Sequence, residues 1–295
     1  MPELPDVVVY LERLTALILG VRLLHVRVRN PFVLRSVSPT PEDLVGRRVV
    51  ALRRIGKRIV LGVEGDLFIV IHLMIAGRLR WRGPAEKPLA GKLVQAAFEF
   101  ENGTLFFTEA GSKRRASMTL VAGETALQAI DRGGIEPLDA TLAEFAERLR
   151  SESHTVKRAL TDPRLFSGIG NAYSDEILHR ARMAPTALTR KMSDDDIARL
   201  YVATRDTLLE WTDRLRAEIG DGFPEKVTAF REGMAVHGRF REPCPVCGAP
   251  VQRIVYADNE TNYCARCQTN GRLLADRALS RLLREDWPRS IDEVE

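Results

Sequence analysis

Four cysteines near the end of the chain have the spacing of a metal site. Cys244 and Cys247 form one Cys-x₂-Cys pair, and Cys264 and Cys267 form a second pair 16 residues later. Four thiolates complete a tetrahedron around Zn²⁺ and leave no open position for water. We therefore expect one structural zinc ion. Free or disulfide-linked cysteines are the alternative, which this spacing and the rarity of disulfides in the cytosol both disfavour.

A glycine-containing joint between two predicted helices could bind an anion. Gly168-Ile169-Gly170 leads into Asn171, which opens the second helix. Glycines let the backbone approach a ligand closely, and a helix N-terminus presents unpaired N–H groups. A DNA phosphate could bind here, and the Asn171 side chain would add a hydrogen-bond donor. A plain turn between two helices is the alternative for this short pattern.

The bulk properties limit the class of protein. The chain has 295 residues, of which 45% are hydrophobic and 28% charged, as in ordinary globular proteins. No apolar run approaches the roughly 20 residues of a transmembrane helix, and the N-terminus lacks the pattern of a secretory signal. We expect a cytoplasmic monomer without membrane contact, associated with the nucleoid if the source is bacterial.

Basic charge gathers in one segment. Residues 21–82 hold 13 Lys and Arg against four Asp and Glu. Such a concentration is typical of nucleic-acid binders, although a solvated basic surface explains it equally well.

The elements that must position these residues change character along the chain. A helix is expected over residues 7–19, and the first part is otherwise β-rich. Residues 58–63 and 66–71 form one predicted hairpin, and residues 96–100 and 104–108 form another around an Asn-Gly turn.

Helices follow near residues 141–150, 154–161, 172–182 and 193–219, and then a hairpin with its tip at residues 257–260. We predict an α+β multidomain protein. Its parts are a β-sandwich with flanking helices (1–125), a helical domain (137–235), a zinc-ribbon hairpin (236–270) and an extension (271–295).

Residues 154–163 and 168–178 resemble the helix-two-turn-helix of the formamidopyrimidine-DNA glycosylase/endonuclease VIII family. The cysteine ribbon follows in the same order, and Pro2-Glu3-Leu4-Pro5 resembles the catalytic start of that family. Gly56-Lys57-Arg58 and His72-Leu73 also match family positions. The resemblance covers residues 1 to about 270 and identifies the chain as a divergent member of the family.

The resemblance implies a nucleophile at the N-terminus. Without Met1, Pro2 is a secondary amine that is partly neutral near pH 8 and able to attack the sugar C1′ of a damaged nucleotide. Glu3 would move a proton to the opening ring. Lys57 would hold a phosphate beside the lesion, and Lys157 and Asn171 would hold phosphates from the helical side. An N-terminal turn proline and a solvated lysine are the alternatives.

An apolar wedge must fill the gap that an everted nucleotide leaves in the duplex. The resemblance places it at Ile75, or at Met74 as second choice; sheet core is the alternative for both.

Three departures from the family pattern affect the expected contacts. Asp6 replaces a typical Glu. The loop at 109–116 lacks the expected Arg-Arg-Phe sequence, so Arg114 or Arg115 would have to contact the orphaned base without a following aromatic. Asn259 aligns with an arginine at the tip of the zinc hairpin.

The sequence thus predicts a DNA-repair glycosylase and abasic-site lyase that acts on damaged double-stranded DNA with oxidised or ring-opened bases. A non-catalytic damaged-DNA-binding protein on the same scaffold, and a glycosylase for alkylated or cross-linked bases, are the alternatives.

Overall fold

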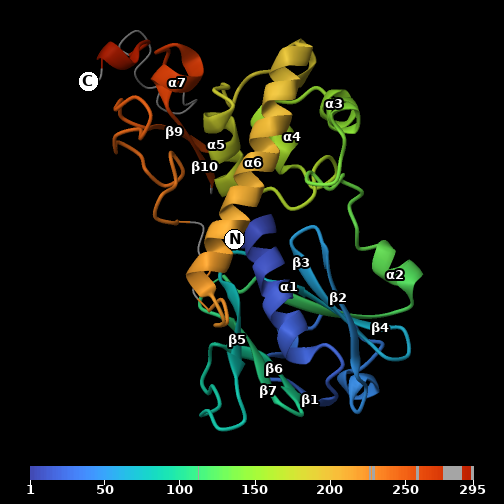
Figure 1. Ribbon diagram of the computed structural model, residues 1–295. Helices are drawn as coiled ribbons and strands as arrows, with labels where there is room; N and C mark the ends of the chain where they lie inside the picture. Colours follow the sequence, from blue (N-terminus) through green and yellow to red (C-terminus); the bar gives the residue numbers. More distant parts are fainter. Residues whose placement is uncertain (112, 226, 228–229, 257–258, 275–287, 294–295) are drawn as a thin grey trace. The chain divides into compact units, whose positions relative to one another are not determined.

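The computed structural model describes residues 1–295 apart from 112, 226, 228–229, 257–258, 275–287 and 294–295 (Figure 1). The chain divides into two compact units. Unit 1 comprises Met1–Arg132 and Trp211–Thr228, and unit 2 comprises Gly133–Glu210 and Ala229–Glu295. Each unit is described by itself.

Unit 1 contains two four-stranded antiparallel sheets, with strand orders β1-β6-β7-β5 and β2-β3-β4-β8. The strands are β1 (Leu23–Val28), β2 (Val49–Ile55), β3 (Arg58–Val63), β4 (Leu67–His72), β5 (Gly77–Arg82), β6 (Val94–Phe100), β7 (Gly103–Glu109) and β8 (Ser117–Ala122). Short 3₁₀ turns η1 (Pro31–Val33) and η2 (Pro41–Leu44) follow β1, and helix α2 (Glu124–Gln128) follows β8.

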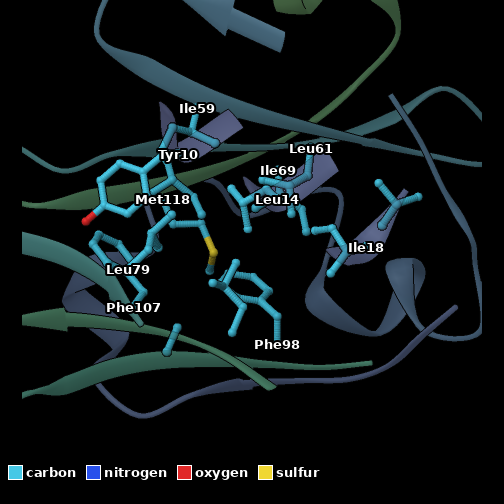
Figure 2. Packing of buried hydrophobic residues seen from close by; sticks show 14 of the residues in the cluster. Tyr10, Leu14, Ile18, Ile59, Leu61, Ile69, Leu79, Phe98, Phe107 and Met118 are labelled. Carbon is cyan, nitrogen blue, oxygen red and sulfur yellow. The ribbon is translucent and has the colours of Figure 1, made fainter. Parts of the chain in front are cut away.

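Helix α1 (Leu4–Ile18) packs into the core that both sheets share. Val7, Tyr10, Leu14 and Ile18 recur at helical spacing, so they form one buried face. This face meets inward residues of both sheets, among them Ile59, Leu61, Ile69, Leu79, Phe98, Phe107 and Met118 (Figure 2). Alternate residues of β3 face opposite sides, so Val60 joins a second, smaller cluster on the outer face.

Tight turns set the registers of these strands. Ile55 pairs with Arg58, which leaves Gly56 and Lys57 as a two-residue loop between β2 and β3. Gly56 has a positive φ of 59°, a conformation that glycine adopts without strain. Gly103 is required for space as well, because a Cβ there would lie 2.4 Å from the Trp81 ring.

Unit 2 is mainly helical before the cysteines. Its helices are α3 (Leu142–Arg150), α4 (Val156–Thr161), α5 (Asn171–Arg180) and the first part of α6 (Asp194–Ile219), with the 3₁₀ turn η3 (Thr189–Lys191). Thr141 caps α3, since its hydroxyl accepts a hydrogen bond from the Glu144 N–H at 3.3 Å. Within unit 2, the end of α4 and the start of α5 are joined by residues 162–170, which form the predicted two-glycine turn.

The zinc hairpin consists of β9 (Gln252–Tyr256) and β10 (Asn259–Tyr263), followed by α7 (Ala265–Thr269). The described part of the extension packs on it. Ile291 of η5 (Ile291–Glu293) is fully buried with Leu273 and Leu274 in the same core as Cys244 and Cys264. Residues 275–287 and 294–295, which make up most of the extension, lie outside the described residues.

The predicted fold class is confirmed, with some differences in detail. The first helix starts at Leu4 rather than Val7, because the acidic side chain of Asp6 caps its first turn. The strands β2, β5 and β8 were not predicted. None of the described helices is long and apolar enough to cross a bilayer.

Candidate active site and nucleic-acid interface

The first turn of α1 places the predicted catalytic residues in a buried position of unit 1. Pro2 is buried and Glu3, the N-cap residue, is only 2% exposed. The Glu3 N–H donates to the Asp6 carboxylate at 2.8 Å, which fixes the backbone just after Pro2. Asp6 therefore has a defined structural role, and its shorter side chain still closes the turn.

Charged groups surround the N-terminal amine. Burial lowers the pKa of the Met1 amine below its ordinary value, and Arg78 and Lys57 lower it further against the carboxylates of Glu3 and Asp6. A buried amine with a lowered pKa is neutral, and hence nucleophilic, over a wider pH range. Arg78 was not predicted, although it follows the His72-Leu73 match closely.

Lys57 lies at the turn between β2 and β3. Burial of its ammonium group lowers the pKa of Lys57, and the Glu3 carboxylate opposes this shift. Lys57, Glu3 and the N-terminal amine therefore act on one another electrostatically.

The turn between β4 and β5 holds the two wedge candidates outside the core. Ile75 is 65% exposed, and Met74 is half-buried with a positive φ of 51°. The core alternative is thus wrong for both.

His72 ends β4 just before this turn, and burial, together with the charges of Arg58 and Lys57, lowers its pKa to about 4. His72 is therefore neutral at pH 7.

Hydrogen bonds to a buried carboxylate hold the loop at residues 109–116. The buried carboxylate of Glu109 accepts the backbone N–H groups of Arg115 at 2.9 Å and Ala116 at 3.0 Å. The Arg114 guanidinium donates to the Lys92 carbonyl at 3.3 Å, toward the start of β6. Arg115 is also exposed, so both predicted arginines are accessible, but Arg114 is directed to β6.

In unit 2, the predicted phosphate ligands make contacts within the protein. The Lys157 ammonium donates to the Asn171 carbonyl at 3.1 Å, the Ser174 hydroxyl at 2.9 Å and the Asp175 carboxylate at 2.5 Å. Asn171 lies at the start of α5, where its side-chain amide donates to the Glu260 carbonyl of β10 at 2.9 Å. Both residues stabilise the joint between helices and hairpin, and all three donors of Lys157 have protein acceptors.

A buried polar network that the sequence did not reveal continues from Lys157. The other oxygen of Asp175 lies 2.8 Å from Nδ1 of His237. The Glu176 carboxylate accepts three backbone N–H groups, from Ala235 at 2.7 Å and from Val236 and His237 at 2.9 Å. Burial still raises the pKa of Glu176 above its ordinary value, against these hydrogen bonds. The consecutive Asp175-Glu176 pair early in α5 was the available sequence signal.

The four cysteines have the geometry of a tetrahedral zinc site. Their sulfur atoms all lie within 4.8 Å of one another, with Cys247 to Cys264 at 3.4 Å and Cys244 to Cys267 at 3.9 Å. Zn–S bonds of about 2.3 Å in a tetrahedron place sulfurs roughly 3.8 Å apart, so the set fits one Zn²⁺. His179 of α5 approaches Cys244 Sγ at 3.3 Å, which ties the site to the helices.

Asn259, predicted at the tip of the zinc hairpin, is exposed and pairs with Tyr256 as the first residue of β10. The other predicted tip residues Ala257 and Asp258 lie outside the described residues. Two arginines near the hairpin have acidic partners: Arg253 lies 3.4 Å from Glu260, and Arg266 lies 3.3 Å from Asp292.

Residues 220–233 follow α6 and include 226, 228 and 229, which lie outside the described residues. Phe223 packs against Tyr10 with ring centroids 5.8 Å apart, as a core anchor in unit 1. Phe230 is 67% exposed and stacks on His237 in unit 2 at 5.6 Å.

Sequence models of one family match three successive parts of the chain. They describe the formamidopyrimidine-DNA glycosylase N-terminal domain (residues 1–115), its H2TH domain (134–214) and a zinc finger found in FPG and IleRS (241–270). The formamidopyrimidine-DNA glycosylase of Heliobacterium modesticaldum is 33% identical over 283 residues, covering 91% of this chain and 100% of that protein. The chain belongs to the formamidopyrimidine-DNA glycosylase family.

Solved structures agree with this assignment. The crystal structure of MutM (Fpg) from Thermus thermophilus matches with a TM-score of 0.74 and 32% identity, covering 90% of this chain and 98% of that one. A Lactococcus lactis Fpg mutant in complex with a Fapy-dG-containing DNA has a TM-score of 0.78 at 23% identity, covering 91% and 100%. Membership of the formamidopyrimidine-DNA glycosylase family makes this chain a DNA-binding repair glycosylase with one structural zinc.

Proposed function

We propose that the chain is a bifunctional enzyme that removes oxidised or ring-opened bases from duplex DNA and then cleaves the strand. The observation that carries the proposal is the buried first turn of α1, where the N-terminal amine lies within the influence of Glu3, Lys57 and Arg78. Several relatives at 30% identity or more are named formamidopyrimidine-DNA glycosylase.

The proposed reaction begins after Met1 is removed. The neutral amine of Pro2 attacks C1′, a N–C1′ bond forms, and the glycosidic C1′–N bond breaks as the damaged base leaves as its anion and takes a proton from water. The Glu3 carboxylate takes the proton of the attacking amine and gives it to O4′, so the C1′–O4′ bond breaks, the sugar ring opens and a cationic iminium remains. Loss of a C2′ proton from the iminium then expels the 3′ phosphate. Hydrolysis of the iminium returns the free amine.

Lys57 and neutral His72 would hold a phosphate of the damaged strand beside this amine. Ile75 would fill the space of the everted nucleotide, with Met74 as the other candidate, and Arg115 would contact the orphaned base. Lys157, Asn171 and Asn259 remain candidates for the helical and hairpin side. The internal contacts of Lys157 and Asn171 favour a role in presenting backbone N–H groups rather than direct charge contacts.

Borohydride trapping on duplex DNA with an abasic site tests this proposal. We expect a covalent adduct whose peptide map places the DNA on Pro2, in protein whose intact mass lacks Met1. Glu3→Gln should reduce the trapping rate at least tenfold, and Pro2→Gly should also reduce it. Glu42→Gln, which removes an exposed carboxylate of η2, is the matched control and should trap at the normal rate.

An absent adduct with intact lesion-specific DNA binding would instead identify a non-catalytic damage-binding protein. Incision of alkylated or cross-linked substrates in preference to oxidised ones would identify the third alternative.

A further inference from the structure

Basic and exposed apolar residues from segments far apart in the sequence lie together on the sheet β1-β6-β7-β5. They lie along the edge where β1 and β7 end and where β6 and β5 begin. The carbonyl of Gln95 accepts the N–H groups of Arg29 and Asn30, which places the end of β1 beside the start of β6. The Glu109 N–H donates to the Leu93 carbonyl, and Gly77 pairs with Glu109. The residues that follow β1, precede β6, follow β7 and precede β5 therefore share this edge.

A cavity of about 650 Å³ opens at the β1–β6 end of this edge. Arg29, Lys92 and Arg114 line it with Asn30, and none of the described lining residues is acidic. Three cations around one cavity repel one another, and an anion in the cavity would remove this cost. Arg29 and Lys92 are exposed, so their charged groups are accessible to a large ligand.

The wall of the cavity is rigid. The Asn30 side-chain amide donates to Oε1 of Gln95 at 2.6 Å, and the Gln95 amide donates to the Leu93 carbonyl at 3.1 Å. Gln95 itself is only 1% exposed. This buried amide thus fixes the turn that carries Arg29 to the strand that follows Lys92, so both cations are held near each other before any ligand binds.

The position of the cavity on the sheet indicates the anion. The wedge candidate Ile75 precedes β5 at the opposite end of the same edge, and neighbouring strands lie about 4.8 Å apart. Three strand spacings separate β5 from β1, or roughly 14 Å, which corresponds to about four base pairs at 3.4 Å per step. Exposed Leu93, 52% accessible, lies between them. A duplex that received Ile75 in its gap and lay along this edge would reach the cavity after about four base pairs.

We propose that Arg29, Lys92 and Arg114 bind a backbone phosphate of the undamaged strand, up to about four nucleotides from the gap. The inference rests on the proposed function only in its DNA-binding part. It also explains why Arg114 is directed toward β6: this arginine serves the phosphate site, and Arg115 is left for the orphaned base.

Binding to a duplex with a tetrahydrofuran abasic analogue, which is not excised, tests the proposal. Single methylphosphonates replace successive phosphates of the undamaged strand within four positions on either side of the gap. We expect one position that weakens wild-type binding roughly three- to fivefold, as for one lost phosphate contact. Arg29→Gln/Lys92→Gln should lose affinity for the unmodified duplex and show no further loss at that position. The slope of log K against log salt should fall by roughly 1 to 2.

Arg27→Gln is the matched control, because Arg27 lies on β1 but pairs with Glu99 at 2.5 Å and does not line the cavity. This variant should keep the position-specific loss. The proposal would be overturned if Arg29→Gln/Lys92→Gln lost as much affinity as wild type at each methylphosphonate position, or if its salt slope were unchanged. So would wild-type competition by pyrophosphate without any position-specific effect, which would indicate a site for a free phosphate compound. The trapping assay is independent of these outcomes, because the analogue reports binding alone.

Discussion

At the N-terminal end of α1, a buried amine lies under the influence of two cations and two carboxylates. Burial lowers the pKa of the amine, and the nearby positive charges of Arg78 and Lys57 act in the same direction. In the proposed mechanism only the neutral amine attacks C1′, so activity should be lost as the pH falls through the pKa of the terminal amine and retained above it.

We therefore expect the single-turnover trapping rate to rise with pH, with a midpoint below the ordinary pKa of a terminal amine. Arg78→Gln should move the midpoint upward, since one of the cations that disfavour the charged amine is gone. The pH profile of trapping at fixed ionic strength measures this shift. A midpoint at or above 8 in the wild-type enzyme would contradict the proposed environment.

His72 links pH to the stability of unit 1. Its folded-state pKa of about 4 lies below the ordinary value of 6.5, so the folded state favours the neutral ring. The stabilisation is present above pH 6.5 and is lost as the pH falls toward 4, by up to about 3 kcal/mol. Urea unfolding should show that His72→Gln is less sensitive than wild type to pH between 6.5 and 4. Parallel profiles for the two proteins would show that burial of His72 is not coupled to folding.

At the scale of elements, substitution of Lys157 distinguishes a structural role, joining α4 to α5, from direct binding of a DNA phosphate. Lys157→Met removes one partner of a buried ion pair, and we expect the free energy of unfolding to fall by about 3 kcal/mol. Arg158→Met, at the exposed next position, should change it by less than about 0.5 kcal/mol. A stable Lys157→Met variant whose salt slope for DNA binding drops by about 1 would instead identify a phosphate clamp.

The turn between β4 and β5 offers a test of the wedge. Ile75→Ala should leave the melting temperature unchanged, because the side chain is 65% exposed, but should lower the rate of base excision several-fold. Val37→Ala, at a position 93% exposed, is the control for loss of a surface apolar group. Normal excision by Ile75→Ala would leave Met74 as the candidate.

Local patterns predicted those elements whose signal lies within the element itself. The hairpins of β3–β4 and β6–β7 carry turn dipeptides between apolar runs, and α6 carries a Ser193 cap followed by three aspartates. β5 was not predicted, although Leu79 and Trp81 alternate with arginines, which is the pattern of a strand with one buried face.

The candidate site was predictable to the same limited degree. The cysteine ligands follow from spacing alone, and Pro2, Glu3 and Lys57 follow from family positions. The partners of Lys157, the network of Asp175 with His237, and the cavity beside Arg29 arise from contacts between residues 14 or more positions apart. No local pattern encodes such pairs.

At the scale of the whole molecule, the zinc should stabilise unit 2 and leave the stability of unit 1 unchanged. The four-cysteine site is linked to α5 through His179, and β10 is linked to α5 through Asn171. Native mass spectrometry should find one Zn²⁺ per chain. After chelation, hydrogen exchange should increase in residues 243–274 and at residues 235–237, while the amides of α1 stay protected. An equal increase in α1 would show that the two compact units unfold together.

The burial of the first residues of α1 also constrains when the enzyme matures. Pro2 is buried and Met1 is only partly exposed in the folded chain, so an aminopeptidase has limited access to the bond between them. Removal of Met1 must then precede the docking of α1 on the sheets, while the chain is still being synthesised. Under the proposed mechanism, a molecule that folds before processing would be trapped as an inactive form, with a stable fold and its terminal amine on Met1 instead of Pro2.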